Sequence, residues 1–338
     1  MSEAGNPGPT PERLMQMAWA FAPPLAIEAA LRNRVFDVLD AGPKTLQQIS
    51  IETGASTRGL AAVMNLLVSL NLLEKTGQTY QLTPDSAAFL VTSQPGYQGG
   101  IFRHISTQLL PRFLSLTEVV KTGKPATDVS DASQGQEFFT QLVEDIFPMS
   151  YQPARALARE LNLGSIQEPV SVLDIAAGSG VWGIALAQSS PNVRITAVDW
   201  PDVLPVTQKI VARFGLEDRL TLVAGDILEA DFGSGHRVAT LGHILHSEGQ
   251  ERSRELLKRV FAALAPGGTI AIAEFLVNND RTGPVPAVIF AVNMLVNTKE
   301  GDTYSFEEIS TWLTDCGFRN VRTLEARGPS PLILADKP

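Results

Sequence analysis

The sequence predicts an α/β protein with a Rossmann-like, doubly wound domain in its C-terminal half, preceded by a mainly α winged-helix domain. From Val170 onward, apolar strand-like runs alternate with stretches of helical periodicity, which is typical of a mostly parallel sheet. Before Val170, helical patterns and one hairpin pattern predominate. We place the winged helix at 12–94, a helical linker that contributes to a substrate pocket at 95–165, and the Rossmann-like domain at 166–338.

The N-terminal domain is predicted as three helices followed by a β-hairpin. Apolar residues recur at helical spacing, Gly42-Pro43 and Gly54 end the first two helices, and Ser56-Thr57 caps the third. Two short strands flank Gly77, as in a hairpin. The predicted ranges are helices 25–39, 45–52 and 57–70 and strands 72–75 and 80–82.

A winged helix raises the possibility of a ligand-responsive DNA-binding regulator. The candidate recognition helix, 57–70, carries a single basic residue, Arg58, whereas base reading and phosphate anchoring need several. The chain also has a net charge of −9, which repels nucleic-acid phosphates. The mainly apolar helix suits packing against another chain, so we expect a homodimer and no nucleic-acid partner.

The linker segment is predicted to be helical and rich in large apolar residues. Such residues build a protein core, and they also line flat apolar pockets, so their spacing does not separate the two uses. The notable ones are Phe102, Phe113, Leu114, Phe138, Phe139, Leu142, Phe147, Met149 and Tyr151.

The C-terminal domain is predicted as alternating strands and helices, the last helix beginning at a Ser305–Glu308 capping box. In such folds ligands bind at the carboxyl ends of the strands. The predicted strands are 170–175, 194–198, 220–224, 238–245, 269–275, 320–324 and 331–335, and the predicted helices are 181–188, 203–214, 250–264, 286–295 and 306–316.

A glycine loop joins the first of these strands to its helix. Gly178 and Gly180 let the backbone approach a ligand closely. With Gly183 they form G-x-G-x-x-G, and Asp199 follows about 20 residues on, so an NAD-dependent dehydrogenase is one interpretation. Asp174, four residues before Gly178, argues against it, because a carboxylate would repel a pyrophosphate.

Acids lie at the ends of three successive predicted strands, at Asp174, Asp199 and Asp226. Aspartates at strand ends often only cap the next helix. Three of them beside a glycine loop instead indicate an anionic rim for a cationic cofactor. S-adenosylmethionine (SAM) carries a sulfonium and an ammonium and no phosphate, so the pattern favours SAM over NAD.

At these positions the chain resembles the small-molecule O-methyltransferases of plants and bacteria, of the caffeic acid and aromatic polyketide type. The resemblance covers nearly the whole chain and implies a SAM-dependent enzyme that methylates a hydroxyl of a small, aromatic molecule. Its motifs are Val172-Leu-Asp-Ile-Ala-Ala-Gly-Ser-Gly180, Ala197-Val-Asp199, Gly225-Asp226, His243-Ile-Leu-His246, and Leu264-Ala-Pro-Gly-Gly268 before Ile270-Ala-Ile-Ala-Glu274.

The resemblance also implies roles for the cofactor-binding residues. Asp174, Gly178 and Gly180 would lie behind the amino-acid part of SAM. Asp199 would bind the ribose hydroxyls, Asp226 the adenine amino group, and Ile227 would pack on the adenine ring.

For the chemistry, the resemblance implies that His246 is the general base and that Glu274 orients it. His243 is expected to be structural or to line the cofactor pocket, and His236 to lie in a solvated loop. The substrate wall would be formed by Asn293, Met294, Asn297 and Thr298.

The sequence departs from the family pattern near the base. Ser247-Glu248 replaces the family's Asp-Trp, Thr303 aligns with a second glutamate, and Gly242 aligns with a cofactor-holding lysine of plant members. A C- or N-methyltransferase, or an enzyme that uses SAM without transferring its methyl group, therefore stays open as an alternative.

Other classes of site and location are disfavoured. The single cysteine, Cys316, excludes an internal disulfide and fits a reducing cytoplasm. No carboxylate–histidine spacing requires a metal, so we expect metal-independent transfer. We find no uninterrupted apolar run of the roughly 20 residues that cross a membrane and expect no membrane partner.

Overall fold

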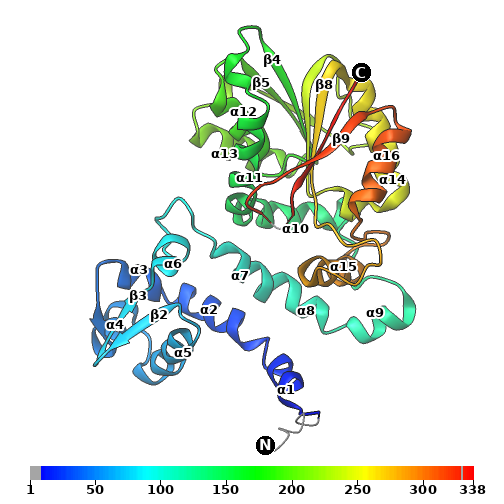
Figure 1. Cartoon of the computed structure of the whole chain (residues 1–338). Helices are drawn as coiled ribbons and strands as arrows, with labels where there is room; N and C mark the ends of the chain where they lie inside the picture. The colour runs from blue at the N-terminus through cyan, green and yellow to red at the C-terminus, as the bar shows by residue number, and fades with distance from the viewer. Residues whose placement is uncertain (1–8, 329) are drawn as a thin grey trace, which may run out of the picture. The chain divides into compact units, whose positions relative to one another are not determined.

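The computed structural model describes residues 9–328 and 330–338 and divides the chain into two compact units, Met1–Thr107 and Gln108–Pro338 (Figure 1). The boundary between the units falls inside the segment that the sequence predicts as a linker. The first unit holds a small sheet and the second holds a large one.

The N-terminal unit consists of short helices and a three-stranded antiparallel sheet in the order β1-β3-β2. Local capping residues set its helix limits. Thr45 and Gln48 form a capping box at α4, and Gly54, with a φ of 74°, ends that helix. The elements are α1 (Glu12–Ala18), α2 (Ala22–Arg32), α3 (Val35–Asp40), β1 (Lys44–Thr45), α4 (Leu46–Thr53), α5 (Thr57–Ser69), β2 (Leu73–Thr76), β3 (Thr79–Leu82), α6 (Pro84–Phe89) and α7 (Gly100–His104).

Two predictions for this unit need correction. The single helix predicted at 25–39 is two helices, because Arg34 adopts a left-handed conformation, with a φ of 58°, between α2 and α3. Strand β1 pairs with β3 and was not predicted. A two-residue strand carries no alternating pattern that a sequence reading detects.

Helices fill most of the chain between the small sheet and the large one. A π-helical turn, Ile105–Leu109, leads into four helices of the C-terminal unit. They are α8 (Leu110–Phe113), α9 (Leu116–Thr122), α10 (Ala132–Asp145) and α11 (Phe147–Glu160), followed by a 3-10 turn, Leu163–Ser165. The helical prediction for this segment is confirmed.

The large sheet has seven strands in the order β6-β5-β4-β7-β8-β10-β9. The pairs from β6 to β8 are parallel, and β10 runs antiparallel to both neighbours, which confirms the mostly parallel, doubly wound sheet. The strands are β4 (Val170–Ile175), β5 (Val193–Asp199), β6 (Leu220–Ala224), β7 (His236–Gly242), β8 (Leu264–Ala273), β9 (Arg319–Leu324) and β10 (Leu332–Asp336). The helices between them are α12 (Val181–Ser189), α13 (Leu204–Arg213), α14 (Leu245–Ala263), α15 (Val285–Asn297) and α16 (Phe306–Asp315), with a 3-10 turn at Glu217–Arg219.

The segment around β7 differs from its prediction. The strand begins and ends earlier than 238–245, and the next helix begins at Leu245 rather than at 250. His236 is therefore buried in the sheet, where its ring contacts the Ser171 hydroxyl at 2.7 Å, and the expectation of a solvated loop is wrong. His246 lies in the first turn of a helix instead of just after a strand.

Alternate strand residues face two separate cores. Val172 of β4 packs with residues of α11, α12 and α13, whereas Leu173 packs with residues of α14 and α16. The period of two along each strand thus puts helices on both faces of the sheet. The carboxyl ends of β4, β5, β6 and β7 stay uncovered by these helices and form the floor of a pocket.

Candidate functional site

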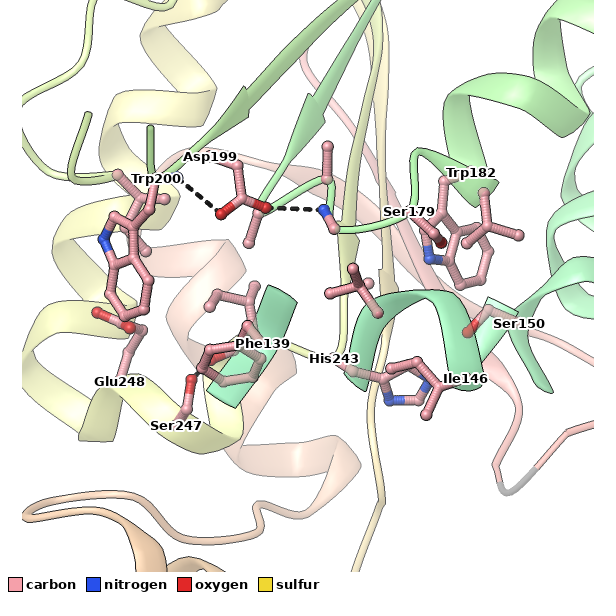
Figure 2. A pocket seen from close by; sticks show the side chains of 18 of the residues that line it. Phe139, Ile146, Ser150, Ser179, Trp182, Asp199, Trp200, His243, Ser247 and Glu248 are labelled. Atoms are coloured by element: carbon pink, nitrogen blue, oxygen red, sulfur yellow. Dashed lines mark hydrogen bonds between the residues drawn. The ribbon is translucent and has the colours of Figure 1, made fainter. Parts of the chain in front are cut away.

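A pocket lies at the carboxyl ends of four parallel strands, as the fold class predicts. The loops after β4, β5 and β6 form one side, and Phe139 and Ile146 of the linker helices form another. Ser247 and Glu248, in the first turn of α14, lie on the same side as Trp200 (Figure 2).

The glycine loop is held by the carboxylate of Asp199. Gly178 donates its backbone N–H to Asp199 Oδ2 at 2.7 Å, and Trp200 donates its N–H to Oδ1 at 2.7 Å (Figure 2). Gly178 and Gly180 have φ values of 54° and 73°, which glycine adopts at little cost. A Cβ on Gly178 would come within 3.1 Å of Val143, so the loop is closely packed as well as sharply turned.

Burial raises the pKa of Asp199 to about 6, although its two backbone hydrogen bonds act in the opposite direction. Asp199 lines the pocket together with Asp226 and Ile227. The structure therefore brings three of the predicted cofactor residues to one wall.

Asp174 lies behind that wall. Its side chain is fully buried, its Oδ2 accepts the N–H of Gly183 at 3.0 Å, and its Oδ1 accepts the hydroxyl of Thr240 at 2.7 Å. Burial raises the pKa of Asp174 to about 7. These hydrogen bonds hold α12 against β4 and β7. Direct contact of Asp174 with a cofactor stays a prediction.

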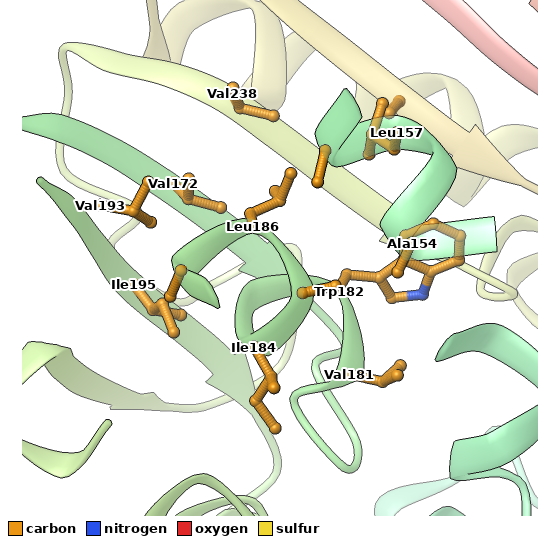
Figure 3. Close-up of a cluster of buried hydrophobic side chains, with 14 of the residues drawn as sticks. Ala154, Leu157, Val172, Val181, Trp182, Ile184, Leu186, Val193, Ile195 and Val238 are labelled. Atoms are coloured by element: carbon orange, nitrogen blue, oxygen red, sulfur yellow. The ribbon is translucent and has the colours of Figure 1, made fainter. Parts of the chain in front are cut away.

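Trp182 serves both the core and the pocket. Its side chain packs in the hydrophobic cluster beneath the glycine loop (Figure 3) and also lines the pocket. A Cβ on Gly242 would come within 2.0 Å of the indole Nε1. The indole therefore occupies the space that a side chain at position 242 would need, so the lysine of the plant pattern has no room there unless the indole moves.

His246 and Glu274 form a buried pair next to the pocket. His246 Nδ1 and Glu274 Oε2 are 2.7 Å apart, and the His246 backbone N–H donates to Oε1 at 3.2 Å. Burial opposes ionisation of Glu274, but the charge and hydrogen bonds of His246 hold the pKa of Glu274 below its ordinary value. The structure brings the two predicted catalytic residues together, and no hydrogen bond reaches Nε2 of His246 from the described residues. The role of His246 as general base stays a prediction.

His243 is the second histidine of the site and lines the pocket. It has a φ of 63°, and its Nδ1 is buried without a hydrogen-bond partner in the described part of the chain. Burial lowers the pKa of His243 to about 4, so the ring is neutral at pH 7. The ligand atoms of His243, His246 and Glu274 lie within 4.8 Å of one another, and the expectation of metal-independent transfer stays a prediction.

The four predicted substrate-wall residues lie together at the end of α15. Asn297 donates to Asn293 Oδ1 at 2.9 Å, and the Thr298 hydroxyl donates to the Met294 carbonyl at 2.7 Å. Arg112 of α8 donates to Asn297 Oδ1 at 3.3 Å. None of the four lines the described pocket, so their contact with a substrate stays a prediction.

Two aromatic residues beside His246 escaped the sequence reading. The Phe290 ring centroid lies 4.8 Å from that of His246, and Phe275 and Phe290 stack with centroids 3.9 Å apart. Phe290 stands four residues before Met294 on α15, so helical spacing alone places it on the face of the predicted wall. Trp200 was also missed, although it directly follows the predicted Asp199.

The pocket suits a ligand with positive charge and with hydroxyl or amino donors. Asp199, Asp226 and Glu248 supply carboxylates, and no lysine or arginine is among the described lining residues. A pyrophosphate would face these carboxylates with no counter-charge in the lining, which argues against NAD.

Comparison with protein families agrees with this chemistry. A model described as an O-methyltransferase domain matches residues 136–319, and one described as an O-methyltransferase dimerisation domain matches residues 15–92. The chain belongs to the O-methyltransferase family. The family match confirms the winged-helix dimerisation prediction for the N-terminal domain and decides against the dehydrogenase.

Individual relatives cover nearly the whole enzyme. It is 30% identical over 326 residues to 3-hydroxy-5-methyl-1-naphthoate 3-O-methyltransferase of Streptomyces sahachiroi, covering 94% of this chain and 92% of that one. It is 29% identical over 338 residues to the tetracenomycin polyketide synthesis 8-O-methyl transferase TcmO of Streptomyces glaucescens, covering 97% of each chain.

Solved structures share the fold over the full length. A crystal structure from Nostoc punctiforme, assigned as an O-methyltransferase, has a TM-score of 0.87 and 30% identity and covers 97% of this chain and 100% of that chain. Human N-acetylserotonin methyltransferase in complex with SAM has a TM-score of 0.84 and 22% identity, covering 100% of this chain and 99% of that chain. The enzyme is SAM-dependent, and the carboxylates, glycine loop and indoles of its pocket fit this cofactor.

Proposed function

We propose that the enzyme transfers a methyl group from SAM to a hydroxyl of a small aromatic molecule, with His246 as general base. The observation that carries this proposal is the buried His246–Glu274 pair, 2.7 Å apart, beside the stacked rings of Phe275 and Phe290. Aromatic rings favour stacked or edge-on contact with a planar acceptor.

The residues of the enzyme have three tasks in this reaction. SAM, when bound, supplies the methyl group on its sulfonium. His246 takes the proton of the hydroxyl, because a phenol with a pKa of about 10 is a weak nucleophile while neutral. Glu274 fixes the ring through Nδ1 and stabilises the imidazolium that results. The apolar walls exclude water and align the reactants, which contributes on the order of 7–11 kcal/mol in favourable cases.

The acceptor class follows from the relatives and from α15. Two relatives are named for a hydroxynaphthoate and for tetracenomycin polyketide synthesis, so we propose a fused-ring aromatic hydroxyl as the acceptor. The wall at Asn293, Met294, Asn297 and Thr298 adjoins Phe290 along the same helix and would contact the part of the acceptor away from the reacting hydroxyl.

A methylation assay with SAM and a panel of hydroxynaphthoic acids and phenols tests this proposal. The expected product carries the new methyl group on oxygen, as determined by NMR. A methyl group on carbon or nitrogen, or turnover of SAM without methyl transfer, would instead support the alternative that the Ser247-Glu248 departure leaves open.

We also propose that the enzyme is a cytoplasmic homodimer. The match of residues 15–92 to a dimerisation domain supports the dimer, as do the exposed Leu14, Met15, Trp19 and Phe21 at the start of the chain. The stretch Glu12–Arg32 is long and apolar enough to cross a membrane, contrary to the expectation from the sequence, and little of it is buried. A partner copy would cover this surface.

Light scattering tests the dimer. The expected mass is twice that of the 36.4 kDa chain, and Trp19→Glu is expected to shift the equilibrium toward monomer. Glu12→Gln, which removes a charge at the start of α1, the helix that Trp19 follows, is the control. A monomeric wild type would contradict the proposal.

A further inference from the structure

A bend in the backbone at Gly249 sets the position of Glu248. The first turn of α14 is separated from the rest of the helix by Gly249, whose φ of 75° and ψ of 168° are not helical. A Cβ on Gly249 would come within 2.7 Å of the Glu300 Cβ, so only glycine fits this bend as it stands. The bend turns Ser247 and Glu248 onto the pocket wall, on the side of Asp226.

The carboxylate of Glu248 is almost fully buried, and only one of its two oxygens accepts a hydrogen bond from the described residues. Its side chain is 7% exposed, and Oε2 accepts a hydrogen bond from Arg252 Nε at 2.6 Å. No hydrogen bond reaches Oε1 from the described residues. Burial raises the pKa of Glu248, against the influence of Arg252, because a carboxylate in this place lacks water. An oxygen acceptor in a pocket wall with no protein donor is open to a donor on the ligand.

Asp226, the residue implied by the family pattern for adenine, is in the opposite condition. Its Oδ1 accepts from the Leu228 N–H at 2.8 Å and from Arg252 Nη2 at 3.1 Å, and its Oδ2 accepts from the same Nη2 at 2.9 Å. Both oxygens are therefore engaged. Arg252 bridges Asp226 and Glu248, because a guanidinium offers several donors in one plane.

We propose that Glu248 recognises the adenine of SAM by accepting a hydrogen bond from its exocyclic amino group through Oε1, while Arg252 positions both acids. The family pattern has a tryptophan at position 248, so this enzyme reads the amino group with charge where that pattern has a flat apolar surface. Trp200, on the same side of the pocket (Figure 2), supplies an aromatic surface instead. The proposal rests on the SAM dependence of the enzyme and assigns a further residue to recognition of this cofactor.

Calorimetric titration with two product analogues tests the proposal without any methyl transfer. S-adenosylhomocysteine (SAH) has an amino group at the six position of its base, whereas S-inosylhomocysteine has an oxygen there. The wild type is expected to prefer SAH by about 10- to 100-fold, the range for a hydrogen bond to a charged group. Glu248→Gln is expected to lose most of this preference, because an amide also donates to an oxygen.

The glutamine variant still offers Arg252 an oxygen acceptor, so the fold is not put at risk. Glu251→Gln, at an exposed position on the same helix, is the matched control and should keep the wild-type ratio. An unchanged ratio in Glu248→Gln, or an equal loss of both analogues, would overturn the proposal. Because no acceptor molecule takes part, this result is independent of whether His246 is the base.

Discussion

The cofactor half and the acceptor half of the site differ in what positions their residues. Asp199 ends β5 and Asp226 lies two residues after the end of β6, so the sheet itself brings them together. His246, Phe275 and Phe290 come from a helix start, a loop and α15, and only side-chain packing brings them together. The cofactor half is therefore constrained by backbone topology, whereas the acceptor half is free to vary in shape. This division suits a family whose relatives act on different acceptors with one cofactor.

The largest expected effect comes from a variant in the acceptor half, and it tests whether the two halves of the site are independent. Replacing His246 by alanine should lower kcat by about 100- to 10,000-fold, the range for loss of a general base, and leave the dissociation constant of SAH unchanged. Steady-state kinetics and calorimetry on the same preparation measure both quantities.

Glu274→Gln is a milder variant that tests the same catalytic pair. The amide keeps the size of the side chain but removes the charge behind the imidazole, so kcat should fall by less than in His246→Ala. Full activity of His246→Ala would show that the base is wrongly assigned.

A second effect tests how tightly the cofactor half is packed. Gly242→Ala should lower the free energy of unfolding by about 1–3 kcal/mol, because the new Cβ would come within 2.0 Å of the Trp182 indole. Denaturant unfolding measures it. Trp182→Leu frees the space beside position 242. Gly242→Ala should therefore cost less stability when it is added to Trp182→Leu than when it is made in the wild type. A Gly242→Ala variant as stable as the wild type would mean that the indole is free to move.

A smaller effect concerns pH. The pKa of Asp199 is raised to about 6, so the group gains a proton as the pH falls through that value and then loses acceptor capacity for ribose hydroxyls. SAH affinity should therefore fall by about tenfold from pH 7 to pH 5. Titrations at several pH values test this expectation.

Asp199→Asn should bind more weakly at pH 7 and lose this pH dependence. Asp202→Asn, at an exposed position three residues on, is the control and should keep it. A wild-type affinity that is flat between pH 7 and pH 5 would contradict the role of Asp199.

More of the cofactor half than of the acceptor half could be predicted from the sequence, because backbone topology leaves local signals in the sequence and side-chain packing does not. Strand periodicity, capping boxes and the glycine loop are local signals, so the sheet, α4, α16 and the acids at strand ends were predicted from residues a few positions apart. The pairing of His246 with Glu274 spans 28 positions and came from the family resemblance.

Features that depend on distant contacts were missed. The link from Arg252 to Asp226 crosses 26 positions, and the filling of the space above Gly242 by Trp182 depends on packing between two elements. The hydrogen bonds of Asp174 to Gly183 and Thr240, which engage both of its oxygens inside the fold, were likewise not predicted, and its contact with a cofactor stays a prediction.

The most direct measurement compares SAH affinity and kcat in Asp199→Asn and His246→Ala, prepared and assayed side by side with a hydroxynaphthoic acid acceptor. The account predicts a crossed pattern, in which Asp199→Asn loses affinity for SAH but retains turnover at saturating SAM, while His246→Ala binds SAH normally and loses turnover. If His246→Ala weakened SAH binding as much as Asp199→Asn, the division of the site into two separately built halves would be contradicted.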